Sequence, residues 1–410
     1  MRGARCGCTT HDARRTPHHE GVMTSRTRLI VLSLSAPVIV FAIVGGFLGR
    51  VMAREESYQN LRIFDDVTQL ITNNYVETVN VDKVMNGAMR GLAEALDPDS
   101  AFLSPQEVKQ AESATPLPAG DVGLELTRQY YLRVIAARDN SPAAKAGLRT
   151  GDFIRMIDTQ PTRDLSVWEG LRALHGAPGS TVRLTVIRGN AVDPHVVELT
   201  REVLSAPDAT SRMAAPGVGY LRVAGFGAKA VEQAKARLAE LTKNGASQVI
   251  VDVRRTSGGP LDAGIGLARL FVSKGTLAVR ETRNGQRETI EAAEGDGSLK
   301  MPVFVLIDAG TSGPAELFAA ALAGNDRAEL VGERTIGRAA AQKLIKLPDG
   351  SGLWLSTTKY LTPSGNPLHE KGLEPTVAVD EPDVEFGQPA PTTDPVLEKA
   401  IERATQKKAA

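Results

Sequence analysis

Short apolar runs alternate with helical patterns over the C-terminal half of the chain. The runs Val249–Val253 and Val303–Ile307 are each followed by a turn rich in small residues. Runs of this length, bounded by Gly, Ser or Asp, predict buried strands. Apolar residues at helical spacing mark Ala230–Leu241, and a helical pattern also covers Leu261–Phe271. The alternation predicts a mixed α/β core with some parallel pairing over residues 216–380.

The run at Val303–Ile307 leads into a strand–turn–helix elbow. A turn of small residues, Gly310–Gly313, precedes a segment rich in Ala and Leu, Ala315–Ala323, which is typical of a helix. Pro314 fits the first helical position and Gly324 the position past the end. A tight turn at a helix N-terminus can expose a nucleophile and bind an oxyanion. The elbow is therefore the candidate active site.

Residues 120–204 show a different pattern of short strands around one helix. The segment from Ser141 to Asp158, SPAAKAGLRTGDFIRMID, together with this order of elements, resembles a PDZ domain. The resemblance places Gly123, Leu124, Glu125 and Leu126 in the loop that binds a peptide's C-terminal carboxylate. In such domains the peptide also adds as a strand to the sheet edge. Peptide binding and a purely docking or regulatory role both stay open for this domain.

The flanking regions carry weaker patterns. Residues 56–110 are predicted to form an N-terminal helical region, since apolar residues recur at spacings of three and four. Residues 381–410 are predicted to form a Pro-rich linker followed by a terminal helix.

Composition narrows the class of protein. The 410 residues are 42% hydrophobic and 23% charged, and the 48 Lys and Arg balance the 48 Asp and Glu. This is a globular composition without the basic excess that nucleic acid attracts, so no nucleic-acid partner is expected. The only cysteines, Cys6 and Cys8, have a spacing that matches no common metal site. No metal site is therefore predicted.

The N-terminus predicts a membrane protein. Residues 29–49 contain no charged residue and follow a basic tail, residues 1–28. Roughly 20 apolar residues span a bilayer, and a basic flank favours a cytoplasmic N-terminus. We expect a single-pass anchor in the inner membrane, with the main domains extracytoplasmic, in the periplasm. A cleaved signal peptide is the alternative, and Met23 is a plausible start that would leave the first 22 residues as a tail.

Several motifs resemble those of the C-terminal processing (tail-specific) peptidases, the S41 serine peptidase family. Asp252-Val253-Arg254 with Gly258-Gly259 is similar to the family's D-L-R-N-N-P-G-G. Tyr360–Gly365 is similar to Y-Y-T-P-S-G, and Gly372–Pro375 is similar to G-I-x-P. The resemblance covers Tyr58 to about Val379. It implies a mixed α/β peptidase core with an inserted PDZ-like β domain, preceded here by the expected N-terminal membrane helix.

The resemblance assigns roles to positions in the elbow. In the family the elbow reads close to G-S-A-S-A-S-E, with a serine nucleophile, and a lysine in F-G-K-G is the base. Aligning on Glu316 puts the nucleophile position at Gly313, and aligning on Ile336-Gly337 puts the base at Arg338. The separation, 338 − 313 = 25, is the family's spacing. Gln342 matches the family's assisting glutamine.

This chain departs from the family at three of these positions. Gly313 has no side chain to attack a carbonyl, and Arg338 stays protonated, so it cannot act as a base. Pro314 has no N–H to lend to the oxyanion hole, where the other expected donor lies near Gly258 and Gly259. Ser312 is the adjacent hydroxyl, but no lysine stands at the base position.

We therefore predict a pseudopeptidase that binds polypeptide C-termini, or regulates an active relative or another envelope protein, and needs no cofactor. Two alternatives stay open. One is an active serine endopeptidase that cleaves envelope proteins by a non-standard route. The other is a purely structural, membrane-tethered adaptor with an occluded PDZ groove.

Overall fold

The computed structural model describes residues 33, 59–189, 193–382, 384–388 and 391–409. The predicted tail, 1–28, and the predicted anchor, 29–49 except Ser33, lie outside these residues. Within the described ranges no helix is both long and apolar enough to cross a membrane. The chain divides after Val84 into two compact units. The first unit contains a helix over residues 59–74 and the start of α2 (Val81–Glu94).

The core of the second unit is a six-stranded sheet in the order β10-β11-β12-β15-β16-β19. The pairing of β10 with β11 is antiparallel, and the pairings from β11 to β19 are parallel. Their bounds are β10 Ala209–Ala215, β11 Val218–Val223, β12 Gln248–Asp252, β15 Val303–Ile307, β16 Ala328–Gly332 and β19 Val377–Ala378. The predicted α/β core is confirmed.

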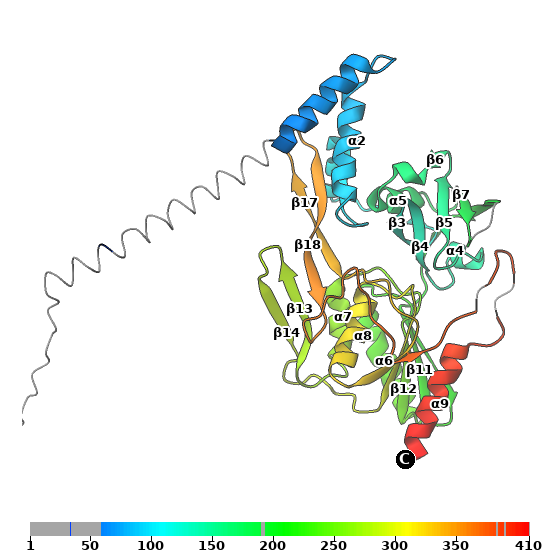
Figure 1. The fold of residues 1–410 in the computed structure, drawn as a ribbon. Helices are drawn as coiled ribbons and strands as arrows, with labels where there is room; N and C mark the ends of the chain where they lie inside the picture. The colour runs from blue at the N-terminus through cyan, green and yellow to red at the C-terminus, as the bar shows by residue number, and fades with distance from the viewer. Residues whose placement is uncertain (1–32, 34–58, 190–192, 383, 389–390, 410) are drawn as a thin grey trace, which may run out of the picture. The chain divides into compact units, whose positions relative to one another are not determined.

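Helices cover both faces of this sheet (Figure 1). One face packs against α6 (Ala230–Lys243), α7 (Leu261–Ala268) and α8 (Pro314–Gly324) through one continuous apolar cluster. Ile250, Phe304 and Leu306 point to the other face and pack against α9 (Pro395–Ala409). Because both faces are buried, the central strands read as apolar runs in the sequence.

A second sheet lies beside this core, in the order β1-β18-β13-β14 with β17 also paired to β18. The strands are β1 Ala101–Leu103, β13 Thr276–Thr282, β14 Arg287–Glu291, β17 Ala340–Lys346 and β18 Gly352–Leu361. The region 56–110 is thus not wholly helical, since β1 pairs with β18 before α3 (Pro105–Glu112) begins. A three-residue strand is too short to give a period-2 signal, and its stability comes from its partner.

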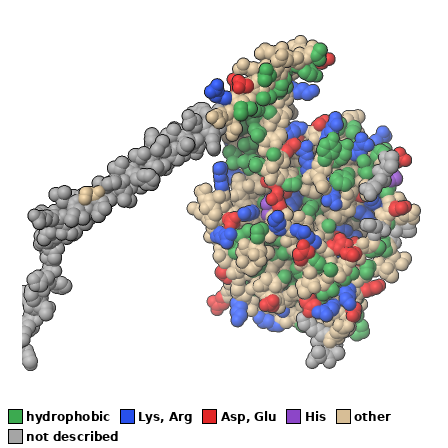
Figure 2. All heavy atoms as spheres, viewed as in Figure 1, with side chains coloured by type: hydrophobic (Ala, Val, Ile, Leu, Met, Phe, Trp, Pro, Cys, Tyr) green, Lys and Arg blue, Asp and Glu red, His purple; other side chains and the backbone are tan. Residues whose placement is uncertain are grey.

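The PDZ-like domain has its own apolar cluster and a sheet in the order β3-β4-β5-β7-β8. Its strands are β3 Leu124–Gln129, β4 Tyr131–Ala137, β5 Phe153–Ile157, β7 Thr181–Ile187 and β8 His195–Thr200, with the short β6 (Gln160–Pro161) on β5. The helices are α4 (Pro142–Lys145) and α5 (Val167–Leu174), and β2 (Gly120–Asp121) pairs with β9 (Glu202–Val203) where the chain enters and leaves. Acidic and basic side chains intermingle over the face of the molecule shown in Figure 2.

The segment predicted as a Pro-rich linker is bound to the core at both ends. The buried guanidinium of Arg254 contacts Glu381 and Asp394, both at 2.7 Å, as well as Asp252 at the end of β12. Between these ends, Phe386 stacks on His195 of the PDZ-like domain with ring centroids 4.4 Å apart. The side chains of Glu381 and Asp394 therefore bind the core, and that of Phe386 binds the PDZ-like domain.

Candidate functional site

The elbow forms as the sequence predicts. Gly313 is the N-cap of α8, with φ 59° and ψ −117°, and Pro314 occupies the first turn. Gly324 is the last residue of the helix rather than the residue after it, and Asn325 is the C-cap. A Cβ added at Gly313 would lie 3.6 Å from the Arg338 carbonyl oxygen and from Leu261 Cδ2, which is ordinary van der Waals contact, so a small side chain fits at this position.

The buried carboxylate of Glu316 joins the elbow to the loop that carries Arg338. It accepts hydrogen bonds from the backbone N–H groups of Gly313 (3.0 Å), Gly337 (2.7 Å) and Arg338 (2.8 Å) and from the Thr335 hydroxyl. Burial raises the pKa of Glu316 to about 7, although these four donors favour the ionised form. Glu316 is the reason that positions 313 and 338, far apart in sequence, lie side by side.

The Arg338 side chain is held by Asp99. Its Nε lies 2.9 Å from both carboxylate oxygens of Asp99, and its Nη2 lies 2.7 Å from Oδ1. Its Nη1 lies 3.9 Å from Oε2 of Glu125. Burial disfavours the charge on Arg338, but the carboxylates of Asp99, Glu125 and Glu316 outweigh burial and raise its pKa above the usual value. The group at the base position is thus a fixed cation.

The two glycines expected near the oxyanion region lie beside the same cleft. Gly258 and Gly259 have φ values of 75° and 98°, in the left-handed region that favours glycine. A Cβ at Gly259 would lie 2.4 Å from the Phe226 carbonyl oxygen. A Cβ at Gly258 would lie 2.2 Å from Oε1 of Glu125. The Glu125 carboxylate therefore packs directly on the backbone of Gly258.

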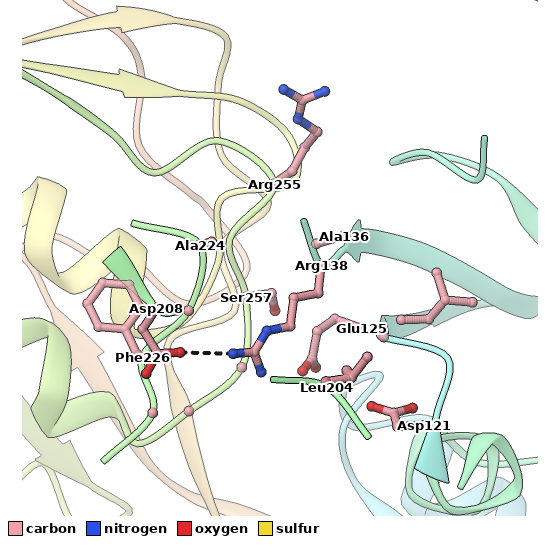
Figure 3. A pocket seen from close by; sticks show the side chains of 16 residues that line it. Asp121, Glu125, Ala136, Arg138, Leu204, Asp208, Ala224, Phe226, Arg255 and Ser257 are labelled. Atoms are coloured by element: carbon pink, nitrogen blue, oxygen red, sulfur yellow. Dashed lines mark hydrogen bonds and ion pairs between the residues drawn. The ribbon is translucent and has the colours of Figure 1, made fainter. Parts of the chain in front are cut away.

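Glu125 comes from the predicted carboxylate-binding loop of the PDZ-like domain. With Gly123 and Leu124 it lines a cavity of about 220 Å³ between this domain and the core. Figure 3 shows Glu125 and Arg138 reaching into this cavity, with Arg138 bound to Asp208 of the core at 3.0 Å. Leu126 is fully buried in the apolar cluster of the PDZ-like domain instead.

The remaining site residues line a second cavity of about 390 Å³. Gly258, Gly259, Ser312, Gly313, Pro314, Arg338 and Gln342 all contribute to it. The Ser312 side chain is fully buried, and its Oγ lies 2.6 Å from Oγ of Ser257. Gln342 donates to the Ser356 hydroxyl at 3.1 Å. In the part of the chain that the structure describes, no three metal-ligating side chains converge.

The comparisons with known proteins identify the family. Residues 217–379 match the sequence model of peptidase family S41, and residues 133–188 match that of the PDZ domain. A carboxyl-terminal-processing protease from Synechocystis sp. is 32% identical over 321 residues, which cover 77% of this chain and 75% of the relative. This chain belongs to peptidase family S41.

Two further proteins resemble this chain in sequence or fold. A carboxy-terminal-processing protease from Bartonella bacilliformis is 28% identical over 360 residues, covering 84% of this chain and 83% of the relative. The solved structure of the photosystem II D1 C-terminal processing protease matches with a TM-score of 0.64 and 26% identity, covering 77% of this chain and 92% of that structure.

The sequence patterns did not predict the place of every side chain at this S41 site. Asp99 lies in the predicted N-terminal helical region, residues 56–110, and no spacing rule connects it to Arg338, 239 residues away. Glu125 was expected only in a peptide-binding loop, whereas it also contacts Gly258 and Arg338. Ser257 stands where the family pattern has proline, and this departure is the signal that could have drawn attention to it.

Proposed function

We propose that this S41 member binds polypeptide C-termini without cleaving peptide bonds. The observation that carries the proposal is the pairing of Gly313 with Arg338 across the cleft. At the nucleophile position there is no hydroxyl, and at the base position there is a guanidinium in a bidentate contact with Asp99.

Serine peptidase chemistry requires what these positions lack. A hydroxyl must lose its proton to a neighbouring base as it attacks, and guanidinium stays protonated in proteins. Pro314 also cannot donate to an oxyanion. The loss of one such donor typically lowers the rate by about 10²–10³.

The cavity beside the PDZ-like loop supports the binding part of the proposal. Gly123 and Leu124 line it, and their backbone is the kind of element that captures a peptide's terminal carboxylate. The relatives are named for processing carboxyl termini. We therefore take protein tails as the ligand class.

A second candidate function is proteolysis through Ser312. The short contact between the Ser312 and Ser257 hydroxyls, 2.6 Å, places two hydroxyls beside the cleft. Ser312 is fully buried, however, and the described residues lining the cleft include no lysine or histidine. A hydroxyl is too weak a base to activate its neighbour, so tail binding is the better supported function.

Incubation of the full-length protein with an unstructured, tail-bearing protein tests both candidates. We expect that this protein neither cleaves the substrate nor is labelled at a serine by a fluorophosphonate. The control is the Synechocystis relative, which should cleave the substrate and be labelled under the same conditions. Cleavage that is lost in Ser312→Ala would establish the second candidate, and cleavage that survives it would also refute the proposal. Peptide titration separates tail binding from a purely structural adaptor, for which no saturable binding is expected.

We also propose that residues 29–49 anchor the protein in the inner membrane, with the main domains extracytoplasmic. The proposal rests on the uncharged stretch and its basic flank. Alkaline extraction of membranes and mass spectrometry of the mature N-terminus test it. A released protein that begins after residue 49 would show a cleaved signal peptide instead.

A further inference from the structure

Arg338 has hydrogen-bonding capacity that Asp99 does not use. A guanidinium carries five N–H groups, and Asp99 is bound along the side formed by Nε and Nη2. The end formed by Nη1 and Nη2 is a second fork. Of its two nitrogens, Nη2 also binds Asp99 at 2.7 Å through its other N–H, whereas Nη1 lies 3.9 Å from Oε2 of Glu125, beyond hydrogen-bond distance. The second fork therefore has room for a carboxylate of its own.

The cleft provides space in front of this fork. Where the family has a serine side chain, Gly313 leaves only contacts of 3.6 Å or more around an added Cβ. The cavity of about 390 Å³ contains both Gly313 and Arg338. The substitutions that remove the nucleophile and the base thus create a cationic recess.

A carboxylate from the protein itself already lies at the edge of this recess. Glu125 packs on Gly258 and lines both cavities, so it lies where the PDZ-like loop meets the cleft. A carboxylate beside a guanidinium and a glycine backbone indicates which ligand chemistry the recess accepts. Arginine recognises carboxylates through two parallel N–H···O bonds.

We propose that the recess at Arg338 binds the C-terminal carboxylate of a polypeptide, and that Glu125 is the resident carboxylate which this ligand displaces. The inference rests on the proposed tail-binding function and deepens it. The former catalytic cleft, rather than the PDZ-like loop alone, holds the end of the chain.

The local charges require this displacement. Arg338 pairs with Asp99 and Arg138 pairs with Asp208, so each of the two cations near Glu125 already has a carboxylate partner, and Glu125, Asp121 and Glu316 add further acidic groups. A second carboxylate can enter favourably only when Glu125 moves away or takes up a proton. Burial raises the pKa of Glu125, Arg338 and Arg138 lower it, and Asp121 and Asp99 raise it. Binding should therefore tighten as the pH falls through the raised pKa of Glu125.

The experiment measures fluorescence anisotropy of the full-length protein with three fluorescein-labelled peptides. One ends in Gly-Ser-Ala-Val with a free carboxylate, the second is its C-terminal amide, and the third is an amide with an internal aspartate. We expect binding of the first alone. The double variant Arg338→Gln/Asp99→Asn removes the fork without changing the net charge and should weaken binding about tenfold or more.

Two further variants control for misfolding. Glu125→Gln should bind the free-carboxylate peptide more tightly at pH 7.5, by about tenfold, and with a flatter pH dependence. A gain of affinity cannot come from unfolding. Arg334→Gln/Glu374→Gln neutralises an exposed ion pair outside the cleft and should leave binding unchanged.

The outcomes separate this inference from the proposed function. If the peptide binds through its carboxylate but Arg338→Gln/Asp99→Asn does not weaken binding, the carboxylate lies in the PDZ-like loop and the inference is wrong. The inference is also wrong if the higher peptide affinity of Glu125→Gln persists in a variant that also carries Arg338→Gln. Equal binding of the internal-aspartate amide would overturn the assignment to a chain terminus. If no peptide binds at all, tail binding itself fails.

Discussion

Rebuilding the family's dyad in this chain tests the argument for lost catalysis. The starting variant is Gly313→Ser/Arg338→Lys, which restores a hydroxyl and an amine at the family's spacing. A serine fits sterically, because the space around Gly313 has no neighbour within 3.6 Å of an added Cβ. Its φ of 59° and ψ of −117° form a backbone conformation that residues with a side chain rarely adopt, which costs about 1–3 kcal/mol. We expect the variant to fold and to show little activity.

Two obstacles remain in that variant, and each has an expected magnitude. Pro314 removes one oxyanion donor, so adding Pro314→Ala should raise the rate by about 10²–10³. Asp99 now binds Arg338 at 2.7–2.9 Å and would sit beside the new lysine. A carboxylate so close raises a lysine pKa by about 1–3 units, and each unit lowers the neutral fraction about tenfold at neutral pH. Adding Asp99→Asn should therefore raise the rate at pH 7 by about 10–10³.

The assay is initial-rate cleavage of an unstructured, tail-bearing substrate between pH 6 and about 10, with thermal melts confirming that each variant folds. The Asp99→Asn step should move the alkaline rise of the pH–rate profile to lower pH, with the rates converging at high pH. That convergence distinguishes a change in lysine pKa from a change in structure. A double variant Gly313→Ser/Arg338→Lys that already cleaves as fast as the Synechocystis relative would refute the reasoning about both Pro314 and Asp99.

Three further predictions concern stability. Arg254→Met should lower the free energy of unfolding by about 3–5 kcal/mol in urea denaturation, because it removes the 2.7 Å ion pair of the buried Asp252 carboxylate. Arg237→Met at an exposed pair should cost under about 1 kcal/mol, and equal effects of the two substitutions would contradict this prediction. Burial raises the pKa of Glu316 from 4.5 to about 7 in the native state, so between these pH values the native state holds a proton that the unfolded chain releases. The free energy of unfolding should therefore fall by about 3 kcal/mol as the pH rises from 4.5 to about 7. Glu316→Gln should remove that slope, and an unchanged slope would assign it to another group. Phe386→Ala removes the stack on His195 and should cost about 1 kcal/mol, with faster hydrogen exchange in β7 and β8; unaltered exchange there would show that the contact does not hold the domain.

The pattern of apolar runs predicts the strands of the central sheet, but it does not predict all strands of the second sheet. β12 and β15 are buried on both faces, so their sequences are nearly continuous apolar runs. β14, Arg287–Glu291, is mostly exposed and carries three charged residues among five. Its strand conformation comes from pairing with β13, which no local pattern in the sequence reports.

The sequence alone was enough to identify the reactive groups that this chain lacks at the elbow. Glycine has no hydroxyl, proline has no N–H and arginine does not release its proton in any fold, so the substitutions at positions 313, 314 and 338 could be interpreted once the motifs were aligned. These properties belong to the residues themselves. They do not depend on what surrounds them.

The tertiary structure decided what the altered site contains instead. Asp99 reaches Arg338 from 239 positions away, and Glu125 of the PDZ-like domain packs on Gly258 of the core. Such contacts depend on the path of the whole chain and on the docking of one domain on another, which residue types and spacings do not encode locally. The sequence alone could therefore show which of the family's groups this chain lacks at the elbow, whereas the fold determined that a guanidinium bound to Asp99 and the carboxylate of Glu125 lie there.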